Sequence, residues 1–408
     1  MNANPKTLKQ IRKQRRRRLA LALACVLASP LAFGQSLPSS TTLPTTTPIN
    51  YDPTKITSIN VVGSDMTITQ VTDAAVIGWT TFNVGSAASV TFVQPGVNSV
   101  VLNYIDGIIP APFIINGAVN ANGSVFFVNP NGIWFGPNAN VNVGGLVAST
   151  LNISAADFYT GAAMANPHYV FGNATDTIGG GIVNQGHLNV TSATGTIALL
   201  AARVENQAGG VINAPGGSAI IGAAAQSTLD FYNDGLTTLA IAGNGLYVPP
   251  VPLGPINLCA AVPLSACLGG IVSIGNIAAV GGHVELRTQT MDGLANTDPL
   301  FTESPTGNGG RIWIGGRIDA RTAGADTGSI IIDAGHGNVD IGGVAGQMAW
   351  VNTTGVNAGE NAGTIQIRGN QLFTYLCVGP GGVCTTNDSL GFIDASGYNT
   401  GNGGHIQI

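Results

Sequence analysis

The stretch GGRIWIGGRIDA, residues 309–320, consists of a Gly-rich turn, a short strand with alternating Ile residues, and an Asp-Ala step. Variations on it return in the segments TGSIIIDAGHGNVDIGG (327–343), AGTIQIRG (362–369), FIDASG (392–397) and GNGGHIQI (401–408). The period is loose, at roughly twenty residues, which is typical of one coil of a solenoid. Stacked coils place Ile and Val in one continuous core. We therefore predict an all-β fold, a right-handed parallel β-helix.

The first half of the chain has the same β texture from about Ile56 onward. Short β-patterned runs are bounded by Gly, Asn, Asp or Pro, as in Ile59–Val62, Met66–Thr69, Ser89–Val93 and Ser99–Leu102. No segment sustains a 3.6-residue apolar period with helix caps. We expect short capping and hairpin strands at the N-terminal end. The last strand, His405–Ile408, has no polar cap, so we expect the coils to continue in a longer parent chain.

Residues 1–34 have the pattern of a signal peptide. Eight Lys and Arg residues precede an apolar run from Leu19 to Phe33, which ends in the small-x-small step Ala32-Phe33-Gly34. A nucleic-acid-binding arm and a lipoprotein anchored at Cys25 are weaker alternatives. Removal of this segment leaves 15 − 8 = 7 basic residues against 20 acidic ones, a net charge of −13. That balance disfavours nucleic acid as a partner.

Four cysteines follow the signal peptide, and they come as two local pairs: Cys259 with Cys267, and Cys377 with Cys384. Neither spacing is the Cys-x-x-Cys of zinc or redox sites. In an oxidising compartment we expect two local disulfides. Each would close a loop of under ten residues, small enough to stay narrow if the chain must be threaded through a pore.

A four-residue turn, Asn129-Pro130-Asn131-Gly132, lies between two uncharged apolar runs in VFFVNPNGIWFG (125–136). Pro130 presets φ at the second position, and Asn131 tolerates left-handed geometry. Taken alone, the tetrapeptide is a structural corner. The aromatic pair Trp134 and Phe135 beside it is better explained by burial than by an exposed docking surface.

The surroundings of this turn resemble the secretion domain of two-partner-secretion exoproteins, the filamentous haemagglutinin-like family. The resemblance rests on GSVFFVNPNGIWFGPNANVNVGGLVAST (123–150), on residues 66–95, on NISAADFYTG (152–161) and on GGGIVNQGHLNV (179–190). Many members carry an additional Asn-Pro-Asn-Leu motif, which this sequence lacks. The implied organisation is a Ser/Thr/Pro linker at 35–50, a secretion domain at 51–240, an irregular Pro/Cys-containing insert at 241–270 and Gly-rich coils at 271–408.

The resemblance implies a route and a partner. In this family the general secretion machinery exports the chain to the periplasm, where a dedicated outer-membrane β-barrel transporter captures its N-terminal domain. The matching positions here are Asn129, Pro130, Asn131, Gly132 and Ile133. The asparagine side chains, with both donor and acceptor atoms, suit contact with the transporter, but they equally suit an internal folding role, and both interpretations stay open.

Parallel β-helices also include polysaccharide lyases and hydrolases, so we searched for paired carboxylates. Four aspartates recur at seven-residue intervals, Asp319, Asp326, Asp333 and Asp340. Asp319 and Asp333 end strands, so we expect them to begin turns, and we expect Arg317 and Arg321 to form surface ion pairs with them. The five histidines, His168, His187, His283, His336 and His405, are scattered singly, which predicts no metal site.

Trp313 and Trp350, which lie among the coils, could stack on sugars, and alternation places Trp313 on the outer face. Together with the family resemblance, these features predict a secreted, non-enzymatic surface adhesin of a Gram-negative bacterium that needs no cofactor. It would bind a receptor or glycan on a host or neighbouring cell. The alternatives are a cytolysin or a contact-dependent toxin carrier of the same secretion family, and a polysaccharide-acting β-helix enzyme.

Overall fold

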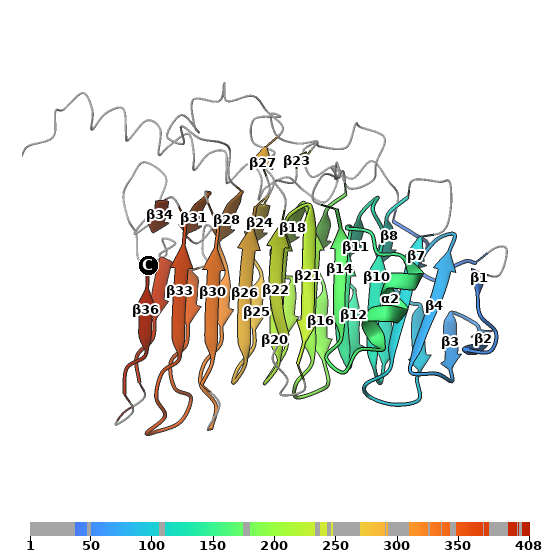
Figure 1. The fold of residues 1–408 in the computed structure, drawn as a ribbon, viewed down its shortest axis with the longest axis horizontal. Coiled ribbons are helices and arrows are strands. Elements are labelled where there is room, and N and C mark those ends of the chain that lie inside the picture. Colours follow the sequence, from blue (N-terminus) through green and yellow to red (C-terminus); the bar gives the residue numbers. More distant parts are fainter. Residues whose placement is uncertain are drawn as a thin grey trace, which may run out of the picture.

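The chain winds into a β-helix with three long sheets around one core, as seen in the computed structural model (Figure 1). The structure describes residues 37–46, 50–105, 111–173, 180–232, 237–242, 246–247, 270–289, 291–292, 310–324, 327–335, 337–342, 348–369, 371–374, 391–397, 399 and 402–408.

We number the three sheets in the order in which one coil visits them. Sheet 1 contains β1 (Asn50–Tyr51), β4 (Ala74–Trp79), β7 (Val100–Ile105), β10 (Ser124–Val128), β13 (Gly145–Ser149), β17 (Thr196–Ala201), β20 (Ser218–Ala223), β26 (His283–Thr288), β30 (Ser329–Asp333), β33 (Thr364–Arg368) and β36 (His405–Gln407). Sheet 2 contains β5 (Asn83–Val84), β8 (Phe113–Ile115), β11 (Ile133–Phe135), β15 (Ile182–Asn184), β18 (Arg203–Asn206), β24 (Gly270–Ser273), β28 (Arg311–Ile314), β31 (Asn338–Ile341) and β34 (Gln371–Thr374).

Sheet 3 contains β2 (Ile56–Val62), β3 (Asp65–Gln70), β6 (Ser89–Val93), β9 (Ala118–Ala121), β12 (Asn140–Val143), β16 (His187–Val190), β19 (Val211–Asn213), β25 (Asn276–Ala278), β29 (Arg317–Asp319), β32 (Ala349–Asn352) and β35 (Gly391–Asp394). A two-stranded pair, β23 (Leu246–Tyr247) with β27 (Met291–Asp292), lies apart from the three sheets.

The coils stack in register, and neighbouring strands within each sheet are parallel. Ser124 pairs with Gly145 and Thr196 pairs with Ser218, so one coil takes 21 or 22 residues where no insertion interrupts it. In Figure 1 the strands of sheet 1 run upward in front while the coils advance from β4 to β36, which is a right-handed turn. The predicted all-β, right-handed parallel β-helix is confirmed.

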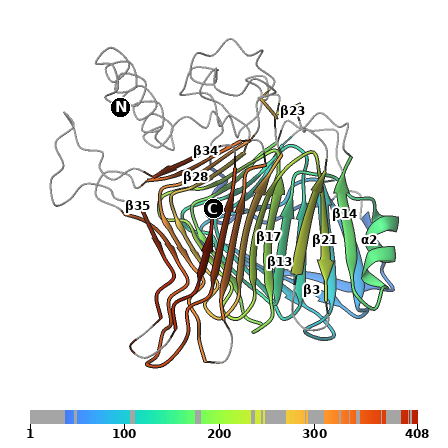
Figure 2. The same ribbon diagram turned by 60° about the vertical axis from the view of Figure 1, so that its left-hand side comes forward.

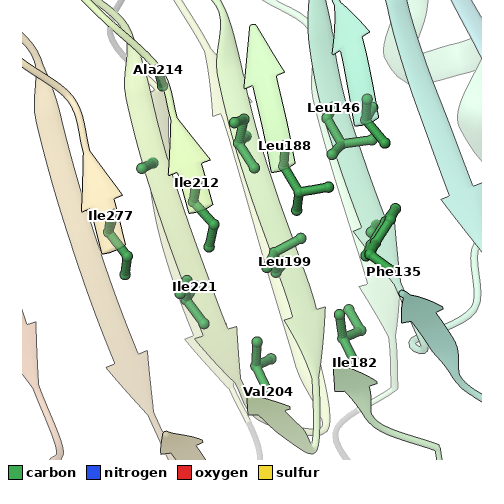
Figure 3. Close-up of a cluster of buried hydrophobic side chains, with 14 of the residues drawn as sticks. Phe135, Leu146, Ile182, Leu188, Leu199, Val204, Ile212, Ala214, Ile221 and Ile277 are labelled. Atoms are coloured by element: carbon green, nitrogen blue, oxygen red, sulfur yellow. The ribbon is translucent and has the colours of Figure 1, made fainter. Parts of the chain in front are cut away.

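The core is one continuous column of aliphatic and aromatic side chains between the three sheets. Figure 3 shows a section of it, with Phe135, Leu188, Leu199 and Ile221 directed inward from different sheets. All of these side chains are buried. The alternating Ile and Val residues of the repeats supply this column because every second residue of a strand points to the same face.

A second apolar cluster lies outside the helix, against the outer face of sheet 1. It is covered by α2 (Ala155–Ala162) and by a three-stranded antiparallel sheet of β14 (His168–Gly172), β21 (Gln226–Phe231) and β22 (Thr237–Ala242), seen at the right in Figure 2. Phe126, Phe158, Tyr169 and Phe171 are fully buried here. The middle strands of sheet 1 are therefore apolar on both faces.

We expected no capped helix from the sequence pattern, and this prediction was wrong. Ser154 caps α2, and its hydroxyl oxygen accepts a hydrogen bond from the backbone N of Asp157 at 3.0 Å. The signal was present as Ser154-Ala-Ala-Asp157, a capping pattern. It is easily passed over because the helix has only eight residues.

The N-terminal end of the column is closed by antiparallel pairing, as predicted. β2 forms a hairpin with β3, and β1 pairs with β4 in the antiparallel direction. Residues 37–46, within the segment expected to be a linker, lie along the first coil. The backbone N of Thr45 donates to Thr81 O at 2.9 Å, and Gly85 N donates to Thr42 O at 2.9 Å.

A column of glycines explains the Gly-rich turns of the repeat. Five of these glycines come directly before a strand of sheet 1, and a Cβ on each would meet the carbonyl oxygen of a glycine in the coil below: Gly195, Gly217, Gly282, Gly363 and Gly404. A Cβ on Gly217 would lie 1.9 Å from the O atom of Gly195, and one on Gly363 would lie 1.8 Å from the O atom of Gly328. No side chain fits there, so glycine is required by close approach.

Candidate functional site

The Asn-Pro-Asn-Gly corner joins β10 of sheet 1 to β11 of sheet 2. Phe127 points from β10 into the main core, and Ile133 and Phe135 do so from β11. These three buried side chains fix both ends of the turn. The corner carries no charged residue, and its geometry is determined by hydrogen bonds and close backbone packing.

Asn129 is completely buried and uses its side chain inside the protein. Its Nδ2 donates to the backbone O of Ala111 in the coil below, at 2.9 Å. Its Oδ1 accepts from the backbone N of Asn131 at 2.9 Å and from Asn131 Nδ2 at 3.1 Å. Its backbone N donates to Ser149 O in the coil above, at 3.0 Å. Asn129 therefore ties three consecutive coils together.

Gly132 closes the turn. Its backbone N donates to Asn129 O at 3.0 Å, and its O atom accepts from Phe113 N at 3.0 Å. Gly132 has φ = 120°, and no positive φ occurs at Asn131. Asn131 does not adopt the left-handed geometry that it could tolerate. The positive φ falls instead on Gly132, which has no side chain to oppose it.

The coil above lies directly on this turn. A Cβ on Gly180 would lie 2.2 Å from Pro130 O, and the O atom of Gly180 accepts a hydrogen bond from Thr150 Oγ1 at 3.2 Å. Sequence reasoning did not connect Gly180 with the corner, because residues 150–181 include the α2 insertion and hide the coil length. The backbone N of Ile133 also donates a hydrogen bond to the O atom of the neighbouring Gly181, at 3.1 Å.

Only two side chains of the corner reach solvent. Pro130 is exposed and Asn131 is half-buried, whereas Asn129, Gly132 and Ile133 are buried. The corner thus has a buried half that holds the fold and an outer half that a partner could touch. These two halves match the two roles that the sequence left open.

Trp134 and Phe135 are both buried, as predicted, but on opposite faces of β11. Phe135 belongs to the main core, while Trp134 packs on the outer face of sheet 2 against Ile114 and Val183. Its Nε1 donates to Gln185 Oε1 at 3.2 Å. The pair therefore forms no exposed docking surface.

The recurring aspartates end strands and begin turns, as predicted for Asp319 and Asp333. Asp333 Oδ1 accepts a hydrogen bond from the backbone N of Gly335 at 2.9 Å. Asp319 Oδ1 accepts one from the backbone N of Arg321 at 3.3 Å. Arg317 Nη2 lies 3.0 Å from Asp319 Oδ2, and Arg321 Nε lies 2.9 Å from Asp319 Oδ1. The expected ion pairs with Asp319 are confirmed, although this aspartate is buried, whereas Asp333 Oδ2 lies 3.7 Å from Nη1 of a different arginine, Arg287.

The remaining candidates do not gather into a site. Asp340 is buried in β31 of sheet 2, away from Asp319 in sheet 3. Within the ranges given above, no group of three His, Cys, Asp or Glu side chains could hold a metal ion. Asp326, His336, the predicted signal peptide and the four cysteines Cys259, Cys267, Cys377 and Cys384 lie outside the described residues.

The described part of the chain contains no helix long and apolar enough to cross a membrane. Trp313 and Trp350 lie on the outer faces of sheets 2 and 3, because their neighbours along each strand point into the core. Trp313 is 9% exposed, and Trp350 is half-buried.

Comparison with one solved structure supports the fold. The secretion domain of HMW1 from Haemophilus influenzae superposes with a TM-score of 0.58 and 24% identity, over 79% of this chain and 71% of that one. The filamentous hemagglutinin secretion domain gives a TM-score of 0.43 and 12% identity, over 88% of this chain and 96% of that one.

Comparison with curated proteins gives two heme/hemopexin-binding proteins of Haemophilus influenzae. One is 38% identical over 96 residues, which is 24% of this chain and 10% of that protein. The other is 39% identical over 88 residues, 22% of this chain and 9% of that protein. The matched part thus spans about a tenth of the length of these relatives.

The family model described as the TPS secretion domain matches residues 42–408, from the first coil to the last strand. Such domains belong to exoproteins that an outer-membrane transporter secretes across the outer membrane of Gram-negative bacteria. On this match, the chain belongs to the two-partner-secretion exoproteins.

Proposed function

We propose that this protein is a non-enzymatic adhesin whose outer-membrane transporter recognises the outer half of the Asn-Pro-Asn-Gly corner. The observation that carries the proposal is the division of the corner. Asn129 satisfies its hydrogen bonds internally, while Pro130 and the adjacent Asn131 face solvent. A partner that approaches from the periplasm meets an uncharged, rigid ridge with one amide group.

Rigidity matters for this role. The turn is held by the coil below through Ala111 and by the coil above through Gly180, so its exposed atoms have one fixed geometry. A preorganised surface loses little conformational entropy on binding. The amide of Asn131 has one spare donor hydrogen, suited to a backbone carbonyl of the partner.

The test compares secretion of three variants with the cognate transporter co-expressed: Asn131→Ala, Asn129→Ala and, as matched control, Asn140→Ala. Asn140 is an exposed asparagine of the same coil. We expect Asn131→Ala to fold normally by circular dichroism but to lose secretion. Asn129→Ala should be destabilised and secreted less, and Asn140→Ala should change neither stability nor secretion. Normal secretion of Asn131→Ala would return the corner to a folding role alone.

A non-enzymatic role is supported by the interactions of the carboxylates that could otherwise act in catalysis. Asp319 and Asp333 are engaged in turns and ion pairs, so neither offers a free carboxylate for acid-base catalysis. A cytolysin or a toxin carrier of the same secretion family would place its activity in regions other than this column. Purified protein should bind cells without degrading acidic polysaccharides, and polysaccharide cleavage would favour the enzyme alternative.

The two Haemophilus influenzae relatives are named heme/hemopexin-binding proteins, and we do not propose this binding activity for the present protein. The similarity covers about a tenth of each of those proteins. A shared secretion domain accounts for a match of this extent.

A further inference from the structure

A cavity of about 490 Å³ lies outside the main core, under the layer that α2 and the three-stranded sheet form over sheet 1 (Figure 2). Its floor is the outer face of sheet 1 at the start of β7, β10, β13 and β17. The covering layer contributes the opposite wall, through Ala162, Tyr169, Phe231 and Thr237. We call this space the outer cavity. It is separate from the main core, because alternate residues of each strand point to opposite faces of the sheet.

The inner part of the outer cavity is apolar. Phe126 and Val147 of sheet 1 are buried there, as is Tyr169 of β14. The floor is low beside them, because Ser124 pairs with Gly145 at a place where two larger side chains would fill the space. A space of this size with apolar walls is typical of a site for a small organic molecule.

One polar group in this wall has no partner. The Tyr169 side chain is 1% exposed, and its OH makes no hydrogen bond among the described residues. The other buried hydroxyls of the lining, those of Thr196 and Thr237, are paired with each other, with their Oγ1 atoms 2.6 Å apart. A buried hydroxyl without a partner costs stability, and a phenylalanine would fill the same place without this cost. A ligand with an acceptor atom would satisfy the hydroxyl.

Charge restricts the ligand. Asp73, which is exposed, is the one charged residue among the described residues that line the outer cavity. A carboxylate or phosphate on the ligand would therefore meet a negative charge and no positive one. Burial raises the pKa of the Tyr169 phenol well above its usual range, so this group stays protonated and acts as a donor. The lining thus favours a neutral molecule with an apolar body and an acceptor oxygen.

We propose that the outer cavity binds a neutral, largely apolar molecule whose carbonyl or ether oxygen accepts a hydrogen bond from the Tyr169 OH. Ordered water is the other possible partner of this hydroxyl. A buried water needs several polar partners, whereas Phe126 and Val147 provide apolar walls here. The site is separate from the Asn-Pro-Asn-Gly corner, and it goes beyond the transporter and adhesin roles proposed above.

The test uses the full purified chain and two neutral ligands of the same carbon skeleton, butyrophenone and butylbenzene, which differ in one carbonyl oxygen. Ligand-observed NMR titration measures the affinity of each ligand for each variant. Tyr169→Phe should weaken the binding of butyrophenone about fivefold, which is the contribution of one neutral hydrogen bond, and should leave butylbenzene unchanged. The anionic relative 4-phenylbutyrate should bind more weakly than butyrophenone.

A second variant tests the location. Ser124→Phe places a ring on the floor of the outer cavity and should abolish the binding of both neutral ligands. Ser58→Phe is the matched control, because Ser58 is an exposed serine of β2 that does not line the cavity, and it should bind both ligands like the unmodified protein. Circular dichroism of each variant checks the fold.

Four results would overturn the proposal. The first is that neither neutral ligand is bound, and the second is that Ser124→Phe binds both of them like the unmodified protein. The third is that Tyr169→Phe weakens both ligands equally or neither of them; an effect on neither would leave water as the partner of the hydroxyl. The fourth is that 4-phenylbutyrate binds as tightly as butyrophenone.

Discussion

At the scale of single residues, Asn129 and Asn131 show how two identical side chains, two positions apart, acquire different tasks. Asn129 is fully buried and makes three side-chain hydrogen bonds. Asn131 is half-buried and contributes only one of them from its side chain. A buried polar group that loses its partner is expensive, while an exposed one exchanges it for water.

Truncation of the two asparagines should therefore have unequal costs. Asn129→Ala removes the partners of Ala111 O and Asn131 N, and we expect a loss of about 2–3 kcal/mol in the free energy of unfolding. Asn131→Ala should cost less than about 1 kcal/mol. Urea unfolding followed by circular dichroism measures both. Equal costs would mean that the Asn129 hydrogen bonds are replaced by water in the variant.

Tyr169 presents the opposite case, a buried hydroxyl without a partner. Its OH makes no hydrogen bond among the described residues, although the side chain is 1% exposed, and burial raises the pKa of this phenol well above its usual range. Tyr169→Phe keeps the ring between Phe126 and Phe158 and removes the unsatisfied group. We expect a gain of about 1 kcal/mol in unfolding free energy. Tyr232→Phe, at an exposed tyrosine, is the control and should change nothing.

At the scale of elements, turns decide where each strand begins. The glycine column sets the start of the strands of sheet 1, because only a glycine fits against the carbonyl of the coil below. The Asx turns at Asp333 and Asp394 set the ends of β30 and β35. Strand length in this fold is therefore controlled from both sides by local chemistry.

Addition of one methyl group to the column should disrupt stacking. Gly217→Ala would place Cβ 1.9 Å from the backbone O of Gly195, which cannot move without shifting a coil. We expect a loss of about 3 kcal/mol or more. Gly96→Ala is the matched control, because nothing lies within 4 Å of its Cβ position, and it should stay within about 0.5 kcal/mol. Thermal unfolding of both variants distinguishes close packing from a general cost of removing glycine.

The loop before β33 should respond to acid. The Glu360 carboxylate accepts from the backbone N of Gly324, Val356 and Asn357 at 2.6–2.8 Å and from Asn357 Nδ2 at 2.8 Å. Hydrogen bonds from the Asn357 side chain and backbone lower the pKa of Glu360 to about 2. Because the folded pKa lies below the unfolded value of about 4.3, the stabilisation is full above that value and disappears as pH falls through about 2.

Glu360→Gln should therefore lower Tm at pH 6, and the difference from the unmodified protein should vanish near pH 2. Gln keeps the size of the side chain but provides only one acceptor oxygen. A Tm difference that is the same at both pH values would show that the carboxylate charge is not responsible.

The sequence was most informative where structure is local. The repeats at 309–408 predicted β28, β29, β30, β31, β33, β35 and β36, since alternation and turn residues act within a few positions. β32 and β34, with the sequences AWVN and QLFT, carry weaker patterns and were missed. The three-stranded sheet over sheet 1 was also missed, because its position depends on outward-facing residues such as Phe126, whose burial no periodicity reveals. At the corner, the motif was identified, but the Asn129–Ala111 contact depends on how coils stack.

At the scale of the whole molecule, the β-helix is a one-dimensional stack in which each coil contacts mainly its neighbours (Figure 1). Stability in such a fold is close to a sum of coil and interface terms. A chain of this kind can fold one coil at a time. That property is compatible with secretion through an outer-membrane transporter, as the family requires.

Removal of one whole coil should leave the rest of the stack intact. Ser329 pairs in register with Thr364, and Gly328 and Gly363 occupy equivalent places before their strands. Deletion of residues 329–363 joins Gly328 to Thr364 and should set β33 onto β26, so we expect a folded, protease-resistant protein that is still secreted. Deletion of residues 329–341 removes only β30 and β31 and leaves β32 in sheet 3 without a complete coil. That variant should be digested rapidly by trypsin and thermolysin. If both deletions fold equally well, or neither folds, then the stack is not additive and the chain behaves as a single cooperative unit.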